Sequence, residues 1–280
     1  MPDPFASQFA SARAKYGPLS WGWDPSAAIL ESWGLGDTPE GLDRFADLIV
    51  EAAVGTVGLV KPQSAFYERH GWRGVRTLQR LVSEARGAGL LVIVDAKRGD
   101  VGSTNDAYAE AYLGADAPLA GDALTVHPYL GLGAMGAFVD RAQAAGSCLL
   151  VVTRSSNPEG RSIQSAVTSA DHSVEVELLD GIGALNARLA PGGIGPIGAV
   201  VAPTHMDPVL DLAADNGLFL APGVGAQGAT PADVARAFAA CPDRVIPSAS
   251  RSLLAGGPDV GRLRDTAAEL AAQFRDALPA

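Results

Sequence analysis

Eight short apolar segments, each ending in a polar residue and followed by a helix-like pattern, constrain the fold of this chain more than any other feature. We predict strands at residues 18–24, 54–61, 90–95, 123–127, 147–153, 198–202, 218–221 and 244–247. Helical patterns lie between and after them, among them residues 42–53, 75–86, 134–144, 174–189, 208–214, 231–239 and 258–278. Near-continuous apolar strands that alternate with helices are typical of a parallel sheet covered on both faces. Eight such units predict an α/β fold, a (β/α)8 or TIM barrel, with its active site at the carboxyl ends of the strands.

Length and composition fit one barrel domain. A chain of 280 residues suits a single α/β barrel, and no repeat, low-complexity tract or linker divides it, so we predict one domain over residues 1–280. Apolar residues make up 48% of the chain, which supplies a large core. The 21 basic and 31 acidic residues give a net charge of −10, which repels nucleic acid and anionic membrane surfaces. Any phosphate must therefore be held by a local site.

The cysteines, the histidines and the first residues limit the function further. Cys148 and Cys241 form no short-spaced pair, which argues against a disulfide framework or a thiolate zinc site. The 4 histidines show no metal-binding spacing. Residues 1–17 lack a basic segment followed by an apolar one, and the strongest apolar run, residues 90–94, is too short to span a bilayer. We expect a cytoplasmic enzyme that binds no metal, nucleic acid or membrane.

The segment LLVIVDAKRGDVGSTNDAYA, residues 90–109, holds the most informative charges. Asp95 and Lys97 are two residues apart at the end of a strand, so they point to the same side, and Asp100 comes from the loop beyond. Ser103 or Thr104 is expected to cap the helix that follows. A solvated surface loop is the alternative for this motif, but the carboxyl end of a barrel strand is where such enzymes place catalytic groups.

Two further charges end the first two strands. Asp24 follows SWGW, and Lys61 follows VGLV. Three consecutive strands would then direct carboxylates and ammonium groups to one mouth of the barrel. Stability alone does not explain this arrangement, because desolvated charges are costly unless they are paired.

A glycine-rich segment, LAPGVGAQGATP, follows the seventh strand. Gly223, Gly225 and Gly228 match a dinucleotide GxGxxG pattern, but they occur late in the chain and outside an N-terminal nucleotide-binding half, so we reject that reading. Loops after the last two strands of a barrel commonly hold phosphate through backbone N–H groups, and Arg251 adds a guanidinium after the eighth strand. The alternative is a glycine turn selected for its tightness.

The ends of the fourth and fifth strands leave several uses open. Ser155 and Ser156 offer hydroxyls that could recognise an amide, and capping of the loop is an equally good use for one of them. His127 ends the fourth strand, and a hydrogen-bonded histidine of the inner mouth is favoured over a catalytic one. Residues 155–173, rich in Ser, Asn, Pro and Gly, predict a loop over a site.

The ordered set of motifs, DAKRGDVGST followed by PGVGAQG and then Arg-Ser, resembles orotidine 5′-phosphate decarboxylase, particularly its longer bacterial branch. The resemblance runs from Asp24 through Arg251 and implies an enzyme of pyrimidine biosynthesis that converts orotidine 5′-phosphate to UMP and CO2 without a cofactor or metal. Two departures concern packing: Trp21 and Trp23 occupy the first strand where aliphatic residues are expected, and Ser250 stands where a Gly is usual.

The resemblance also implies roles for individual residues. Lys97 would be the proton donor of a charge array with Asp95 and Asp100. A homodimer would share its sites, with Asp100 and Thr104 of each chain reaching the neighbouring barrel, and the loops at 155–173 and 223–230 would become ordered when a UMP analogue binds. The remaining implied positions are Asp24 and Lys61 near the ribose, Ser156 at the pyrimidine, and Gln227 and Arg251 at the phosphate.

Two other functions fit part of the pattern. A magnesium-dependent sugar-phosphate lyase or decarboxylase of the same barrel group would use its carboxylates as metal ligands, but Lys61 and Lys97 crowd the acids here. A non-catalytic phosphate-binding module would keep Gln227 and Arg251 and would have no need of the Asp–Lys–Asp array.

Overall fold

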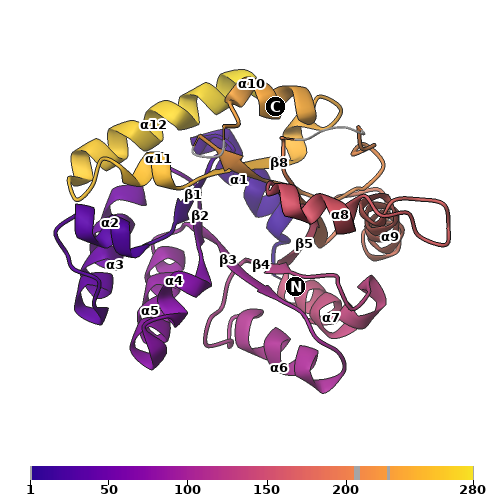
Figure 1. The fold of residues 1–280 in the computed structure, drawn as a ribbon, viewed down its shortest axis with the longest axis horizontal. Coiled ribbons are helices and arrows are strands. Elements are labelled where there is room, and N and C mark those ends of the chain that lie inside the picture. The colour runs from indigo at the N-terminus through magenta and orange to yellow at the C-terminus, as the bar shows by residue number, and fades with distance from the viewer. Residues whose placement is uncertain (1, 205–208, 226–227, 280) are drawn as a thin grey trace.

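The computed structural model describes residues 2–204, 209–225 and 228–279. Eight strands form a closed parallel barrel in chain order, from β1 next to β2 through β8 next to β1 (Figure 1). This confirms the (β/α)8 prediction, and each predicted strand overlaps an observed one. The strands are β1 Ser20–Trp23, β2 Leu59–Pro62, β3 Leu91–Arg98, β4 Ala123–Val126, β5 Cys148–Arg154, β6 Ile197–Val201, β7 Phe219–Val224 and β8 Val245–Ala249.

Helices surround the barrel as a ring (Figure 1). Many begin where the sequence provides a cap: the side chains of Thr38, Ser173 and Thr230 each accept a hydrogen bond from the first turn of the helix that follows. The α-helices are α1 Phe5–Tyr16, α2 Ala27–Ser32, α3 Pro39–Ala53, α4 Ser64–Glu68, α5 Gly71–Gly87, α6 Ser103–Tyr112, α7 Gly136–Ala145, α8 Arg161–Gln164, α9 Val174–Leu189, α10 Pro231–Ala237, α11 Arg251–Leu254 and α12 Val260–Ala277. Short 3-10 turns are η1 Leu132–Met135, η2 Pro158–Gly160 and η3 Pro242–Arg244.

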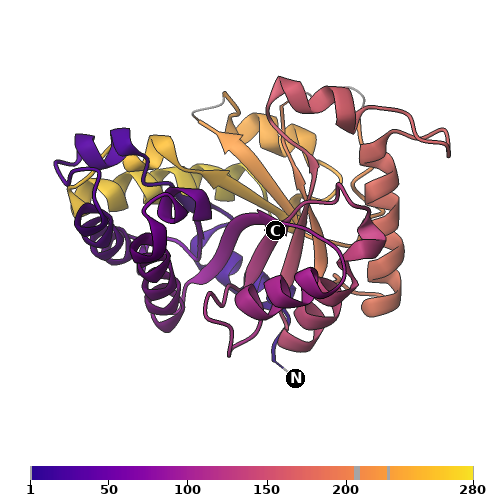
Figure 2. The ribbon, with the colours of Figure 1, turned by 60° about the horizontal axis from the view of Figure 1, so that its bottom comes forward.

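The core has two layers. One fills the barrel and consists of inward residues such as Leu91, Ile93 and Leu150, closed at the amino end by Phe5 and Phe9 of α1. The larger one lies between the barrel and the ring of helices. In Figure 2, the N-terminus and the loop that carries α8 lie at opposite ends of the barrel. Because α1 covers the amino end, the carboxyl ends of the strands form the open end of the barrel.

The tryptophans of β1 belong to the outer layer. Trp21 and Trp23 are fully buried among residues such as Leu30 and Trp33, while the residue between them, Gly22, faces the barrel. A Cβ at Gly22 would lie 2.6 Å from the Cβ of Ser250. The first strand therefore tolerates two large side chains because they point away from the site.

Two helix predictions are wrong. Residues 209–214 form no helix, because buried Leu210 and Leu212 alternate with exposed residues along an extended segment, and the carbonyls of Leu212 and Ala213 accept hydrogen bonds from Arg244. Residue 208, the start of that predicted helix, lies outside the described residues. The N-cap residue of α6 is Gly102, which has no side chain. Neither Ser103 nor Thr104 therefore caps that helix. In the described part of the chain, no helix is both long and apolar enough to cross a membrane.

Candidate active site

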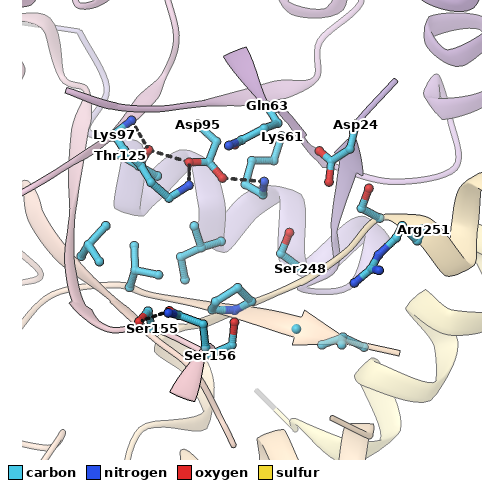
Figure 3. A pocket seen from close by; sticks show the side chains of 18 of the residues that line it. Asp24, Lys61, Gln63, Asp95, Lys97, Thr125, Ser155, Ser156, Ser248 and Arg251 are labelled. Carbon is cyan, nitrogen blue, oxygen red and sulfur yellow. Dashed lines mark hydrogen bonds and ion pairs between the residues drawn. The ribbon is translucent and has the colours of Figure 1, made fainter. Parts of the chain in front are cut away.

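A cavity of about 410 Å³ opens at the carboxyl ends of the barrel strands (Figure 3). Its two sides differ in chemistry. Strands β5, β6 and β7 contribute an apolar wall, made by Val152, Val200, Leu220 and Pro222. The other strands and the residues that directly follow them contribute polar side chains, namely Asp24, Lys61, Gln63, Asp95, Lys97, Thr125, Ser248 and Ser250. A flat ring with polar edges fits between such walls.

Asp95 is the centre of the polar side. Its Oδ2 accepts a hydrogen bond from Lys61 Nζ at 2.8 Å, and its Oδ1 accepts from Lys97 Nζ at 2.5 Å and from Thr125 Oγ1 at 2.8 Å. With its amide nitrogen turned toward the carboxylate, Gln63 donates to Asp95 Oδ2 at 2.7 Å. Asp95 and Lys97 therefore lie on one side of β3, as their spacing in the sequence predicts.

The charges in this cluster stabilise one another. Burial raises the pKa of Asp95, but the positive charges of Lys61 and Lys97 outweigh burial and hold that pKa well below its usual range. Burial lowers the pKa of Lys61, but the charges of Asp95 and Asp24 and the hydrogen bond to Asp95 outweigh it, so that pKa is raised. The site consequently favours the ionised forms of Asp95 and Lys61.

The two lysines differ in access to the cavity. The side chain of Lys61 is 8% exposed, and that of Lys97 is 39% exposed. Lys61 is therefore a buried partner of Asp95, while Lys97 can reach a bound molecule.

The opposite end of the cavity has polar groups without partners. Oδ1 of Asp24 and Oγ of Ser250 are buried and make no hydrogen bond to any described residue. Arg251, at the start of α11, lines the same end of the cavity near Asp24 and likewise has no ion pair within the described part of the chain (Figure 3). Gln227 lies outside the described residues. Buried polar atoms are rarely left unsatisfied, so this end suits a ligand that carries hydroxyls and an anion.

The two serines of the loop after β5 differ in their hydrogen bonds. Ser155 Oγ donates to Asn157 Oδ1 at 2.7 Å and accepts from Gln164 Nε2 at 2.8 Å, so it caps the loop. The hydroxyl of Ser156 lines the cavity and makes no hydrogen bond with the described residues. Ser155 lines the cavity as well, but its hydroxyl is already bonded within the loop, so Ser156 has the freer hydroxyl.

A buried ion pair holds this loop from behind. Glu175, at the start of α9, accepts two hydrogen bonds from Arg154, at 2.7 and 2.6 Å, and both side chains are 0% exposed. Arg161 of α8 lies 3.4 Å from the same carboxylate. The loop is therefore attached to both β5 and α9.

Asp100, Thr104 and His127 do not line the cavity of their own chain. The loop of Asp100 is held by Asn105, whose side chain accepts from Asp100 N–H at 2.8 Å and donates to the carbonyl of Ala134. His127 is exposed and its side chain makes no hydrogen bond among the described residues, so the expectation of a hydrogen-bonded histidine in the inner mouth is wrong. Burial and the charge of Lys97 lower the pKa of His127.

Sequence reasoning missed Thr125 and Gln63. The alternation of side chains along a strand could have identified both. Gln63 lies two residues after Lys61, and Thr125 lies two residues after the inward Ala123. Neither carries a charge, and that is why neither stood out.

Comparisons with known proteins agree with this geometry. A family model described as orotidine 5′-phosphate decarboxylase / HUMPS family matches residues 25–265. A protein of Streptomyces coelicolor named orotidine 5′-phosphate decarboxylase is 48% identical over 278 residues, which cover 99% of each chain. A protein of the same name from Salinispora arenicola is 47% identical over 276 residues, again 99% of each chain.

A solved structure is similar throughout. The crystal structure of a protein from Streptomyces avermitilis, provisionally named orotidine 5′-phosphate decarboxylase, matches with a TM-score of 0.94 and 46% identity. The match covers 99% of this chain and 97% of that one. By sequence, by fold and by the extent of both matches, this chain belongs to the orotidine 5′-phosphate decarboxylase family.

Proposed function

We propose that this protein converts orotidine 5′-phosphate to UMP and CO2, and that residues 1–280 act as one domain in the cytoplasm. The observation that carries the proposal is the hydrogen-bonded Lys61–Asp95–Lys97 cluster, which faces a cavity with unpartnered polar groups at its other end. The names of the relatives, orotidine 5′-phosphate decarboxylase, indicate the substrate.

The chemical step uses the two charged residues of β3. The bond between C6 and the carboxylate breaks, CO2 leaves, and the electron pair stays on C6. Asp95, held ionised, faces the substrate carboxylate and disfavours it, so part of the barrier is removed when CO2 departs. Lys97 stabilises the charge that develops at C6 and then donates a proton from Nζ to that carbon, which forms the C6–H bond of UMP. Solvent then returns a proton to Lys97.

Lys61 supports this pair from the buried side of Asp95. Because it is buried and bonded to Asp95, it fixes the carboxylate rather than reaching the reacting carbon. Its positive charge also allows Asp95 to remain ionised beside a second carboxylate.

The remaining residues hold the nucleotide. The guanidinium of Arg251 suits a phosphate, together with Gln227, and the free carboxylate oxygen of Asp24 suits a ribose hydroxyl. Ser156 is available to the pyrimidine amide. Binding energy gathered at the phosphate end can hold the ring beside Asp95, where the substrate carboxylate is disfavoured.

The donor set favours a reaction without a metal. Both oxygens of Asp95 already accept hydrogen bonds from ammonium groups, and a hard cation would have to displace them. We therefore expect decarboxylation to continue after exhaustive chelation. A magnesium-dependent enzyme of the same barrel group would lose its activity.

We also propose a symmetric dimer with shared sites. Asp100 and Thr104 lie outside the cavity of their own chain, and exposed apolar residues lie close by. Val101, next to Asp100, is 53% exposed, and Tyr129 and Leu130 of the loop after β4, whose His127 contacts Gly99, are 81% and 53% exposed. A second copy that covers these side chains would bring Asp100 and Thr104 over the neighbouring cavity.

The test is a spectrophotometric assay of orotidine 5′-phosphate loss, run with and without a chelator. The unmodified protein should turn over in both conditions. The Lys97→Ala variant should lose turnover and still bind UMP measurably. Appreciable turnover by Lys97→Ala would rule out the proton-donor role, and no turnover by the unmodified protein would rule out the activity.

A further inference from the structure

The ladder between β3 and β4 is interrupted where β3 reaches the cavity. Val94 pairs with Leu124 and Arg98 pairs with Val126, so three residues of β3 stand opposite the single residue Thr125. Lys97 lies in this bulge with a φ of 47°, a left-handed conformation that residues with side chains rarely adopt. Because the regular ladder is interrupted here, the N–H of Lys97 has no main-chain partner on β4 in that ladder.

Thr125 replaces that partner and makes a second bond. Its Oγ1 accepts a hydrogen bond from Lys97 N–H at 3.0 Å and donates one to Asp95 Oδ1 at 2.8 Å (Figure 3). Both directions are fixed, because an amide N–H only donates and an ionised carboxylate only accepts. The residue is 1% exposed, and its bond to Asp95 is buried.

We propose that Thr125 is a positioning residue: its one hydroxyl fixes the main chain of Lys97 and the carboxylate of Asp95 relative to each other. The inference rests on the proposed function, in which Lys97 gives its proton to C6. Proton transfer needs the ammonium group within hydrogen-bond reach of its acceptor, and an error of about 1 Å in such a site can cost about 100-fold in rate.

Loss of the hydroxyl should leave the charges in place. Lys61 still bonds Oδ2 of Asp95, and Lys97 still carries its ammonium group. The bulge of β3, however, would lose the bond that holds Lys97 in its left-handed conformation. The expected defect is therefore one of geometry in the chemical step, with little change in ligand affinity.

The experiment compares Thr125→Val, which keeps the shape and removes the hydroxyl, with Thr125→Ser, which keeps the hydroxyl. Thr153→Val is the matched control, because Thr153 is also fully buried on a barrel strand and, among the described residues, its hydroxyl bonds only the carbonyl of Val151. For each protein, kcat and KM are measured with orotidine 5′-phosphate, and amide hydrogen exchange is measured by NMR.

We expect Thr125→Val to lower kcat by about 10- to 100-fold with KM within about threefold. Thr125→Ser should stay within about threefold of the unmodified protein, and so should Thr153→Val. Exchange at Lys97 N–H should become at least about tenfold faster in Thr125→Val. The N–H of Val92, which bonds Asp122 at 2.8 Å on the far end of β3, is the internal reference for an intact fold.

Three results would overturn the inference. One is an unchanged kcat in Thr125→Val, whatever happens to exchange. Another is an equal loss in Thr125→Val and Thr125→Ser, since packing rather than the hydroxyl would then be responsible. The third is faster exchange at Val92 together with Lys97, which would mean general destabilisation. If the unmodified protein does not release CO2, the proposed function fails, and exchange at Lys97 alone decides whether Thr125 fixes its main chain.

Discussion

Replacement of Asp215 by Asn should make the protein more stable, and the gain should grow with pH. Asp215 is 2% exposed, and neither of its carboxylate oxygens has a hydrogen-bond partner among the described residues. Burial raises its pKa to about 8, although the charge of Arg244 and the amide of Gly217, which lies near the carboxylate without a regular hydrogen bond to it, oppose the shift. The variant keeps the shape of the side chain and removes its ability to ionise.

The direction and size of this change in stability follow from proton linkage. The carboxyl has a pKa of about 3.9 in the unfolded chain, so between about pH 4 and pH 8 the folded state binds the extra proton, and the free energy of unfolding falls as pH rises. At about 1.4 kcal/mol per pKa unit, holding this proton in the folded state while the unfolded chain ionises costs about 4 kcal/mol more at pH 7 than at pH 4. The stability of Asp215→Asn relative to the unmodified protein should rise by that amount over the same range.

Urea unfolding, followed by tryptophan fluorescence at about pH 4, 5.5 and 7, measures this difference directly. Other titrating groups occur in both proteins and cancel in the comparison. Asp211→Asn, at an exposed carboxylate of the same segment, controls for the loss of one negative charge. A stability difference that stays constant from pH 4 to pH 7 would refute the reasoning, because it would mean that Asp215 ionises as easily in the folded protein as in the unfolded chain.

Three further predictions concern the site. Arg251→Ala should lower kcat/KM by about 100- to 10,000-fold, the loss expected for a two-pronged charged contact, and free phosphite should partly restore turnover of a substrate that lacks the phosphate; kinetics equal to those of the unmodified protein would remove Arg251 from the phosphate site. Inactive Lys97→Ala and Asp100→Ala proteins, dissociated together and reassociated, should recover up to about a quarter of normal activity, while a mixture as inactive as its parents would place Asp100 in the site of its own chain. Amide exchange in residues 155–173 should slow when UMP binds, and equal protection in the free and bound protein would argue against closure of that loop.

The sequence was sufficient for the barrel and for the charged residues at its mouth. Apolar strands that end in charges place Asp24, Lys61 and Asp95 at one end, because parallel strands of a barrel share a direction. The spacing of Asp95 and Lys97 predicts that they share a side, and they do. These deductions need only the alternation of side chains along a strand and the common direction of the strands.

The parts that could not be predicted depend on tertiary contacts. The bulge that gives Lys97 its positive φ, and the hydroxyl of Thr125 that bonds it, arise from the register of two strands. The segment at 209–214 has helix-forming residues, but the carbonyls of Leu212 and Ala213 bond Arg244 from another part of the chain. Local pattern alone does not reveal such long-range bonds.

The apolar wall has a consequence for redesign of the protein. None of Val152, Val200 and Leu220 bonds the carboxylate or the ammonium groups across the cavity, so their shapes can be exchanged without breaking an ion pair. Strands β5 to β7 could therefore be remodelled to admit a ring of different outline, while the charged cluster of β2 and β3, with the proposed proton donor Lys97, keeps its place. Under the proposed mechanism, selectivity for the base and proton delivery would be adjustable on separate strands of one barrel.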